Sequence, residues 1–169
     1  MNLLAGLLYD PSVAVGKATN ALLAMTAIDT SNCRLTFTAP RHGQVLVRLV
    51  VPLEIANGGA HPWVMLGVLD GSTIRGRVLA SIGALNNSST VADSLILSAS
   101  FIVSGLPSEG IVSLDAAYGI EIVSTSAATM LKFGGPDDAI EHTAWGGISF
   151  EVYDPQPVLV NASTSRSDH

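Results

Sequence analysis

The residues best suited to chemistry lie in one short loop, Gly134 to His142. This loop contains three carboxylates and one imidazole within six residues, namely Asp137, Asp138, Glu141 and His142. A hard cation such as calcium could use these oxygen ligands, although their spacing differs from that of an EF-hand. The alternative is a solvated acidic loop without a metal, and the sequence indicates no other cofactor.

The sequence carries none of the usual catalytic motifs. It has no phosphate-binding loop, no dinucleotide fingerprint and no His-Glu-x-x-His pair. The closest approach to a nucleophile elbow is Gly105 to Gly110, which has one residue too many before Ser108. The four histidines stand apart from one another, at positions 42, 61, 142 and 169. We therefore predict that the chain is not an enzyme.

Four other side chains are candidates for binding. Arg75 and Arg77 could form desolvated ion pairs with carboxylates across an interface, or they are two solvated arginines on one strand face. Trp63 and Trp145 are the large anchors, and packing in the core or at a subunit interface is the first expectation for both. Stacking on a ligand is the second.

The composition favours self-association. Hydrophobic residues make up 48% of the 169 residues and charged residues 13%, which is about half the usual share. No window reaches the roughly 18 uninterrupted apolar residues of a membrane span, so no membrane insertion is expected. Because monomers rarely expose large apolar patches, we predict that another subunit covers part of the surface.

Charge and cysteine content exclude two further classes of protein. The net charge is −6 and the eight basic residues are scattered singly, so no nucleic-acid partner is expected. The single cysteine, Cys33, excludes an intrachain disulfide and a zinc site built from several cysteines.

Short apolar or alternating segments separated by Gly, Pro, Asn, Asp and Ser predict an all-β fold, an antiparallel β-sandwich or barrel of about eight to ten strands. The predicted strands are Leu22–Ile28, Arg34–Thr38, Gln44–Leu53, Trp63–Leu69, Thr73–Ala80, Ser94–Ser104, Ile111–Asp115, Ile120–Ser124, Thr129–Phe133 and Gly147–Tyr153. A short helix is expected from Pro11 to about Asn20, because Asp10-Pro11-Ser12 resembles a helix start. The domain plan is an apolar arm over residues 1–20, a β-sandwich over 21–154 and an extended tail over 155–169.

Alternation predicts which side chains face the core. Leu35 and Phe37 point inward from one strand, and Ile148, Phe150 and Val152 from the last. In contrast, Val45 to Val51 and Ser94 to Val103 are apolar at nearly every position. Either a neighbouring subunit meets their outer face, or loops of the same chain cover it.

Two segments carry a family resemblance. Residues 37–48, Phe-Thr-Ala-Pro-Arg-His-Gly-Gln-Val-Leu-Val-Arg, resemble a strand, turn and strand of complement-type globular heads, which are relatives of tumour necrosis factor. Residues 145–154, Trp-Gly-Gly-Ile-Ser-Phe-Glu-Val-Tyr-Asp, are similar to the closing strand of that family. The resemblance implies a jelly roll assembled as a homotrimer, with ligands at loop tips or subunit interfaces.

The chain also resembles short β-rich proteins and tail-fibre segments of tailed bacteriophages, in runs such as Leu22–Asp29, Gly67–Arg77 and Asp115–Gly119. This implies a virion component made in the host cytoplasm, either a capsid decoration protein or part of a tail or fibre, with capsid or tail proteins as partners. The alternative is a host-attachment module that binds a cell-surface glycan through its loop tips.

Overall fold

The structure is a computed structural model that describes residues 1–9, 15–18, 24–56, 63–81, 93–120, 130–133 and 147–155. These ranges contain eleven strands and no helix. The eight long strands are β1 (Asn2–Tyr9), β4 (Arg34–Thr38), β5 (Val45–Ala56), β6 (Val64–Asp70), β7 (Thr73–Ser81), β8 (Asp93–Val103), β9 (Ile111–Ile120) and β11 (Ile148–Asp154). Three short strands are β2 (Val15–Ala18), β3 (Thr26–Ala27) and β10 (Met130–Phe133).

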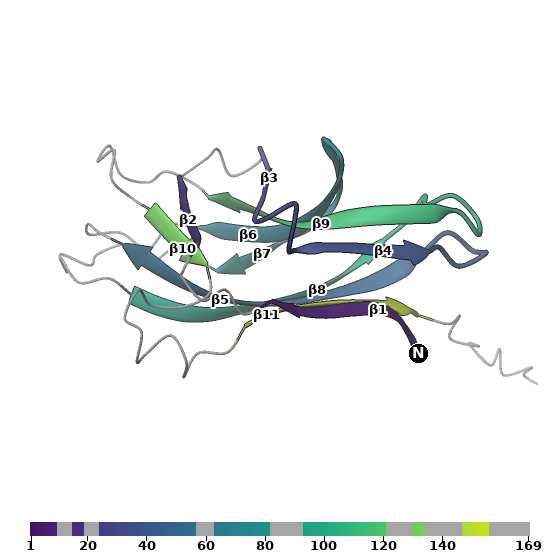
Figure 1. Ribbon diagram of the computed structural model, residues 1–169, viewed down its shortest axis with the longest axis horizontal. Coiled ribbons are helices and arrows are strands. Elements are labelled where there is room, and N and C mark those ends of the chain that lie inside the picture. Colours follow the sequence, from purple (N-terminus) through teal and green to yellow (C-terminus); the bar gives the residue numbers. More distant parts are fainter. Residues whose placement is uncertain are drawn as a thin grey trace, which may run out of the picture.

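The strands form two antiparallel sheets, seen as two layers in Figure 1. Sheet A runs β1-β11-β5-β8, and β10 and β2 continue it beside the last part of β5. Sheet B runs β4-β9-β6-β7, with β3 next to β4 along the same edge of β9. If the eight long strands are numbered along the chain, the sheets read 1-8-3-6 and 2-7-4-5. This is the strand order of a jelly roll, so the predicted fold class is confirmed.

The core lies between the two sheets and has the inward residues that alternation predicts. Leu35 and Phe37 are buried on β4 between exposed neighbours, and Ile148, Phe150 and Val152 are fully buried on β11. Aliphatic side chains from β5, β6, β8 and β9 complete one continuous cluster. Each large side chain contributes roughly 2 kcal/mol by leaving water, so this layer dominates the stability of the fold.

Two predictions about elements were wrong. Residues 15–18 form strand β2 where a helix was expected, because their backbone pairs with β10, whereas an isolated helix of about ten residues is marginal in water. Residues 111–120 form one strand, β9, where a break after Asp115 was expected. β4 and β3 pair with one edge of β9, β6 pairs with the other edge from Asp115 to Ile120, and these backbone hydrogen bonds override the turn preference of Asp115 and Gly119.

A hairpin at Asp70-Gly71-Ser72 joins β6 and β7. Asp70 pairs with Thr73, which leaves Gly71 and Ser72 as a two-residue loop between β6 and β7. Gly71 has φ +60° at the first loop position, where a hairpin turn of type II′ needs a glycine. The tight turn joins β6 to β7 at the edge of sheet B, and the register shifts between Val68 and Leu69.

Candidate functional site

Most of the predicted metal and tryptophan sites lie outside the described residues. Asp137, Asp138, Glu141, His142 and Trp145 all fall in the undescribed stretch from 134 to 146. Calcium binding there stays a prediction. Across the ranges that are described, no three His, Cys, Asp or Glu side chains gather in a way that could hold a metal ion. The same ranges contain no helix long and apolar enough to span a bilayer.

The two predicted arginines lie in different surroundings on β7. The guanidinium of Arg75 donates from Nε and Nη2 to Oδ2 of Asp70, at 3.1 and 2.7 Å. This ion pair closes the β6–β7 hairpin within the chain. Arg77 is exposed and lies opposite Gly67 on β6. Trp63 precedes β6 and is 38% exposed.

The outer faces of the two sheets differ, and the difference identifies a candidate surface. On sheet B the outward residues Gly67, Leu69, Asp115 and Ala117 are buried, and the methyl group of Met25 lies against Gly67. On sheet A the outward residues of β1, β5 and β8 are exposed although many are apolar, namely Leu3, Leu8, Val50, Ile96 and Ile102. We call the outward residues of β1, β11, β5 and β8 the sheet A face.

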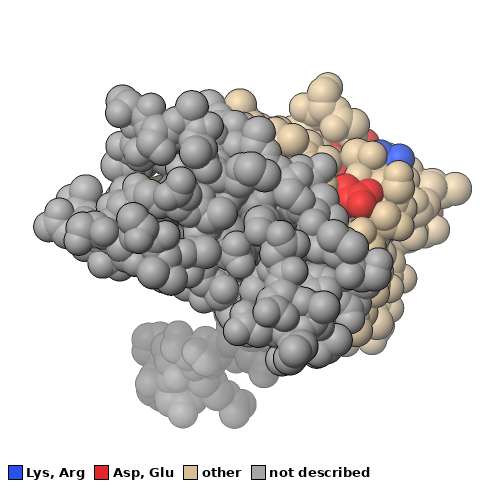
Figure 2. Space-filling model, turned by 60° about the vertical axis from the view of Figure 1, so that its left-hand side comes forward, with Lys and Arg blue, Asp and Glu red and all other residues tan. Residues whose placement is uncertain are grey.

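Charged side chains are sparse on the described surface. In Figure 2, uncharged residues dominate the described part that is visible, and acidic and basic atoms are confined to a few places. The low charge content of the sequence therefore also holds for this part of the surface.

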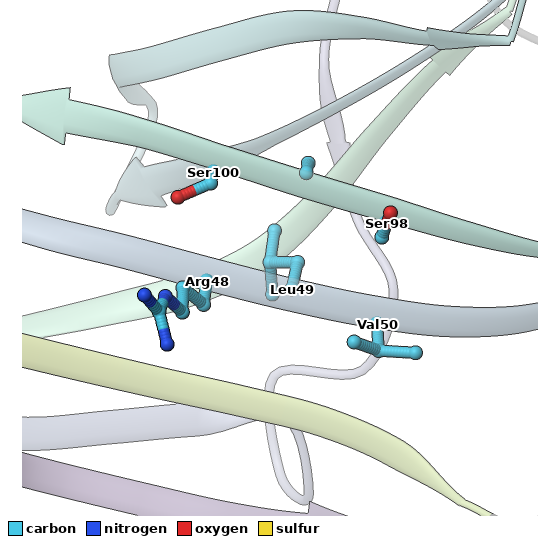
Figure 3. Close-up of a pocket in the computed structure, with 6 residues that line it drawn as sticks. Arg48, Leu49, Val50, Ser98 and Ser100 are labelled. Atoms are coloured by element: carbon cyan, nitrogen blue, oxygen red, sulfur yellow. The ribbon is translucent and has the colours of Figure 1, made fainter.

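The centre of the sheet A face has a shallow hollow of about 360 Å³, bordered by β5 and β8. Its lining comes from Arg48, Leu49, Val50, Ser98, Ala99 and Ser100. In Figure 3, Arg48 and Val50 extend from one side of β5 and Leu49 from the other. The hollow exists because the side chains of Ser98 and Ser100 are too short to fill the space beside Arg48 and Val50.

Three side chains on this face hold one another in place. The guanidinium carbon of Arg48 lies 5.2 Å from the centre of the Tyr153 ring, within range of a cation–π contact. The hydroxyl of Tyr153 donates a 2.8 Å hydrogen bond to Oε2 of Glu151. This hydrogen bond, followed by burial and the charge of Glu151, raises the pKa of the Tyr153 phenol above its ordinary value of 10.0. The three groups present one positive and one negative charge at a fixed place.

Sequence reasoning did not single out Arg48, Glu151 and Tyr153. Arg48 is the one charged residue within the apolar run from Val45 to Leu53, and that contrast could have marked it as an outward position. Its cross-strand neighbours could not have been found in this way. They follow from the register of β11 on β5, which pairs Glu151 with Arg48 and Tyr153 with Leu46.

Loops at one end of the sandwich join the two sheets. Nε2 of His42, in the β4–β5 loop, lies 3.0 Å from Oδ1 of Asp154 at the end of β11, and Nδ1 accepts a hydrogen bond from the backbone of Gln44. The backbone of Leu106 donates to Gly43, and its side chain is buried. These contacts fix the end of the sheet A face near Tyr153.

Comparison with known proteins adds little. No protein-family profile matches the chain. No curated protein matches it either. Among solved structures, it is similar to a chain in the crystal structure of the T13 IBDV viral particle, at 8% identity and a TM-score of 0.44. The match covers 86% of this chain and 31% of that chain, so this chain spans about a third of its length. A likeness of this size does not bear on function.

Proposed function

We propose that the chain is a non-enzymatic structural protein of a virion, assembled into the particle through the sheet A face. The observation that carries the proposal is the contrast between the two outer faces. At the centre of sheet B the outward residues Leu69, Asp115 and Ala117 are buried, while sheet A leaves Leu8 73% and Ile102 50% exposed. Folded monomers rarely leave such a face open to water.

The jelly-roll fold is compatible with this role and with one alternative. Jelly rolls recur in viral capsid proteins and in lectins, so the fold by itself does not choose between a particle subunit and a glycan-binding module. The sheet A face favours the first role, because it is broad, shallow and largely apolar. A glycan site would need several convergent polar groups in a pocket.

The finer parts of the proposal come from the resemblance in the sequence. They are a tailed phage as the source, a homotrimer as the assembly unit, and a place as a decoration protein on the capsid or as part of a tail or fibre. Host attachment through a surface glycan is the alternative role.

Two experiments test the role. Genes for a major capsid protein or a tail tape measure beside the gene for this chain, and labelling of purified particles by an antibody against it, are the expected results. Intact particles that lack the chain would overturn the virion role. A glycan array tests the alternative, and we expect no specific signal.

Light scattering tests the assembly. The expected mass is a multiple of the 17.5 kDa chain, with three chains for the homotrimer. A mass of one chain at high concentration would contradict assembly without a further partner.

A further inference from the structure

The sheet A face has a regular arrangement of apolar and polar rows. Strand pairing places the outward residues of β1, β11, β5 and β8 side by side in rows that cross the sheet. In that strand order, the rows are Leu3, Tyr153, Leu46 and Ile102; then Gly6, Glu151, Arg48 and Ser100; then Leu8, Ser149, Val50 and Ser98. The first row is apolar throughout apart from the Tyr153 hydroxyl, and the middle row carries the two charges.

The charges sit on the two central strands and face each other across them. Glu151 on β11 is paired in register with Arg48 on β5. Tyr153 contacts Arg48 through its ring and Glu151 through its hydroxyl. Among the residues that the structure describes, Arg48 takes part in no ion pair. A carboxylate from a second copy could therefore pair with it without breaking an ion pair among these residues.

This arrangement is complementary to itself. A twofold axis parallel to the strands and midway between β11 and β5 exchanges these two strands between two copies. Arg48 of one copy then faces Glu151 of the other, and the reverse contact forms at the same time. Two sheets packed in this aligned way lie about 10 Å apart, within reach of these side chains.

The apolar residues fit the same axis. It places Leu3 of one copy opposite Ile102 of the other, and Tyr153 opposite Leu46. It also brings Leu8, the more exposed of the two outward β1 leucines, toward the hollow beside Ser98. A protruding side chain thus meets a depression.

We propose that the sheet A face binds a second copy of this chain about this twofold axis, with two reciprocal Arg48–Glu151 ion pairs at its centre. The proposal deepens the proposed function, on which it rests for the premise that the chain assembles. The charges favour a second copy as the occupant. The face carries one positive and one negative charge, and the same face of a second copy presents the opposite charge to each. In a particle built from homotrimers, this contact would join neighbouring trimers.

The sharpest test mixes two charge-reversed variants. Arg48→Glu and Glu151→Arg each place like charges across the twofold contact, so each variant alone should dissociate at least about tenfold more readily. In an equimolar mixture, an Arg48→Glu copy faces a Glu151→Arg copy with opposite charges at both positions. We expect the mixture to regain the association of the native chain, with one copy of each variant in the dimer. Contacts within each copy are the same alone and mixed, so changes in folding cannot produce the recovery.

A second pair of variants tests the apolar rows. Ile102→Lys on the sheet A face should abolish the twofold association, so that sedimentation equilibrium gives half the native mass. Ile111→Lys, at a residue that is 79% exposed on the outer face of sheet B, should leave it unchanged. Far-ultraviolet circular dichroism and urea unfolding verify that each variant is folded.

Three results would overturn the twofold contact. They are a native chain that stays monomeric, a mixture that associates no better than its components, and an association that Ile102→Lys does not weaken. The virion role fails separately. If the mixed variants recover association but the chain is absent from particles, the contact stands and the virion role fails. If the chain is present in particles but the mixed variants do not recover association, the virion role stands and the contact fails.

Discussion

The guanidinium of Arg34 on β4 holds the carboxylate of Asp115 on β9 through two parallel hydrogen bonds. Nε lies 2.7 Å from Oδ1 and Nη2 lies 2.9 Å from Oδ2. Asp115 is 2% exposed, whereas the Arg34 side chain is 45% exposed. The bonds raise the pKa of Arg34, and they satisfy a carboxylate that is otherwise removed from water.

The two partners should respond unequally to substitution. Asp115→Asn removes the charge and weakens both bonds, so the free energy of unfolding should fall by about 2 kcal/mol. Arg34→Met leaves a buried carboxylate without its partner, and this variant should unfold at a lower urea concentration than Asp115→Asn. Urea denaturation followed by fluorescence measures both. Equal midpoints, or the reverse order, would show that Asp115 reaches water in the folded chain.

Gly67 on β6 should tolerate no side chain. A β-carbon there would overlap the backbone oxygen of Gly76 and would lie 2.8 Å from the methyl group of Met25. We expect Gly67→Ala to lower the free energy of unfolding by about 3 kcal/mol, because the backbone of β7 cannot move aside without losing its pairing. Gly6→Ala is the matched control, since the nearest atom there would be 3.7 Å away. Its effect should stay within about 0.5 kcal/mol, and a similar loss in both variants would contradict the packing around Gly67.

The three tyrosines should ionise above the ordinary phenol pKa of 10.0. Burial, then the charge of Asp29, raises the pKa of Tyr9; burial raises that of Tyr118; and the hydrogen bond to Glu151 raises that of Tyr153. The ultraviolet absorbance of the ionised phenolates should therefore rise at a higher pH in the folded chain than in the urea-unfolded chain. Tyr153→Phe should remove one of the three late-titrating groups.

The same shifts fix the sign of the pH dependence of stability. The folded chain holds its phenolic protons more tightly than the unfolded chain. The resulting stabilisation is complete below the unfolded pKa of 10.0 and is lost as the pH rises through the folded pKa values. Urea midpoints should fall in that alkaline window, and a flat profile there would count against the shifts.

Replacement of Glu109 by glycine should stabilise the fold. It is the third residue of the turn Pro107 to Gly110 and has φ +56°, a conformation that suits glycine and strains other residues. Glu109→Gly should raise the free energy of unfolding by about 1 kcal/mol. Ser108→Gly, at the preceding position, should give no gain. A loss of stability in Glu109→Gly would mean that the Glu109 side chain makes a stabilising contact that outweighs the strain.

The sequence by itself determined the fold class and the inward pattern. Period-2 alternation placed Leu35, Phe37 and Phe150 in the core, because successive side chains on a strand point to opposite faces. Glycine and proline favour turn geometry locally, which agrees with the turns at Gly71 and at Pro107 to Gly110. The apolar character of β5 and β8 on both faces left two possibilities, a neighbouring subunit or loops of the same chain against their outer face.

Only the tertiary structure decided which residues from distant segments became neighbours. Local preference predicted a helix where β2 pairs with β10 and a break where β9 continues, because pairing across the sheet is not encoded in adjacent residues. The ion pair of Arg34 with Asp115 spans 81 positions, and the placement of Glu151 beside Arg48 depends on the register of the last strand. A shift of that register by one residue would turn Glu151 into the core, so the sheet A face exists only because the whole sandwich closes in one register.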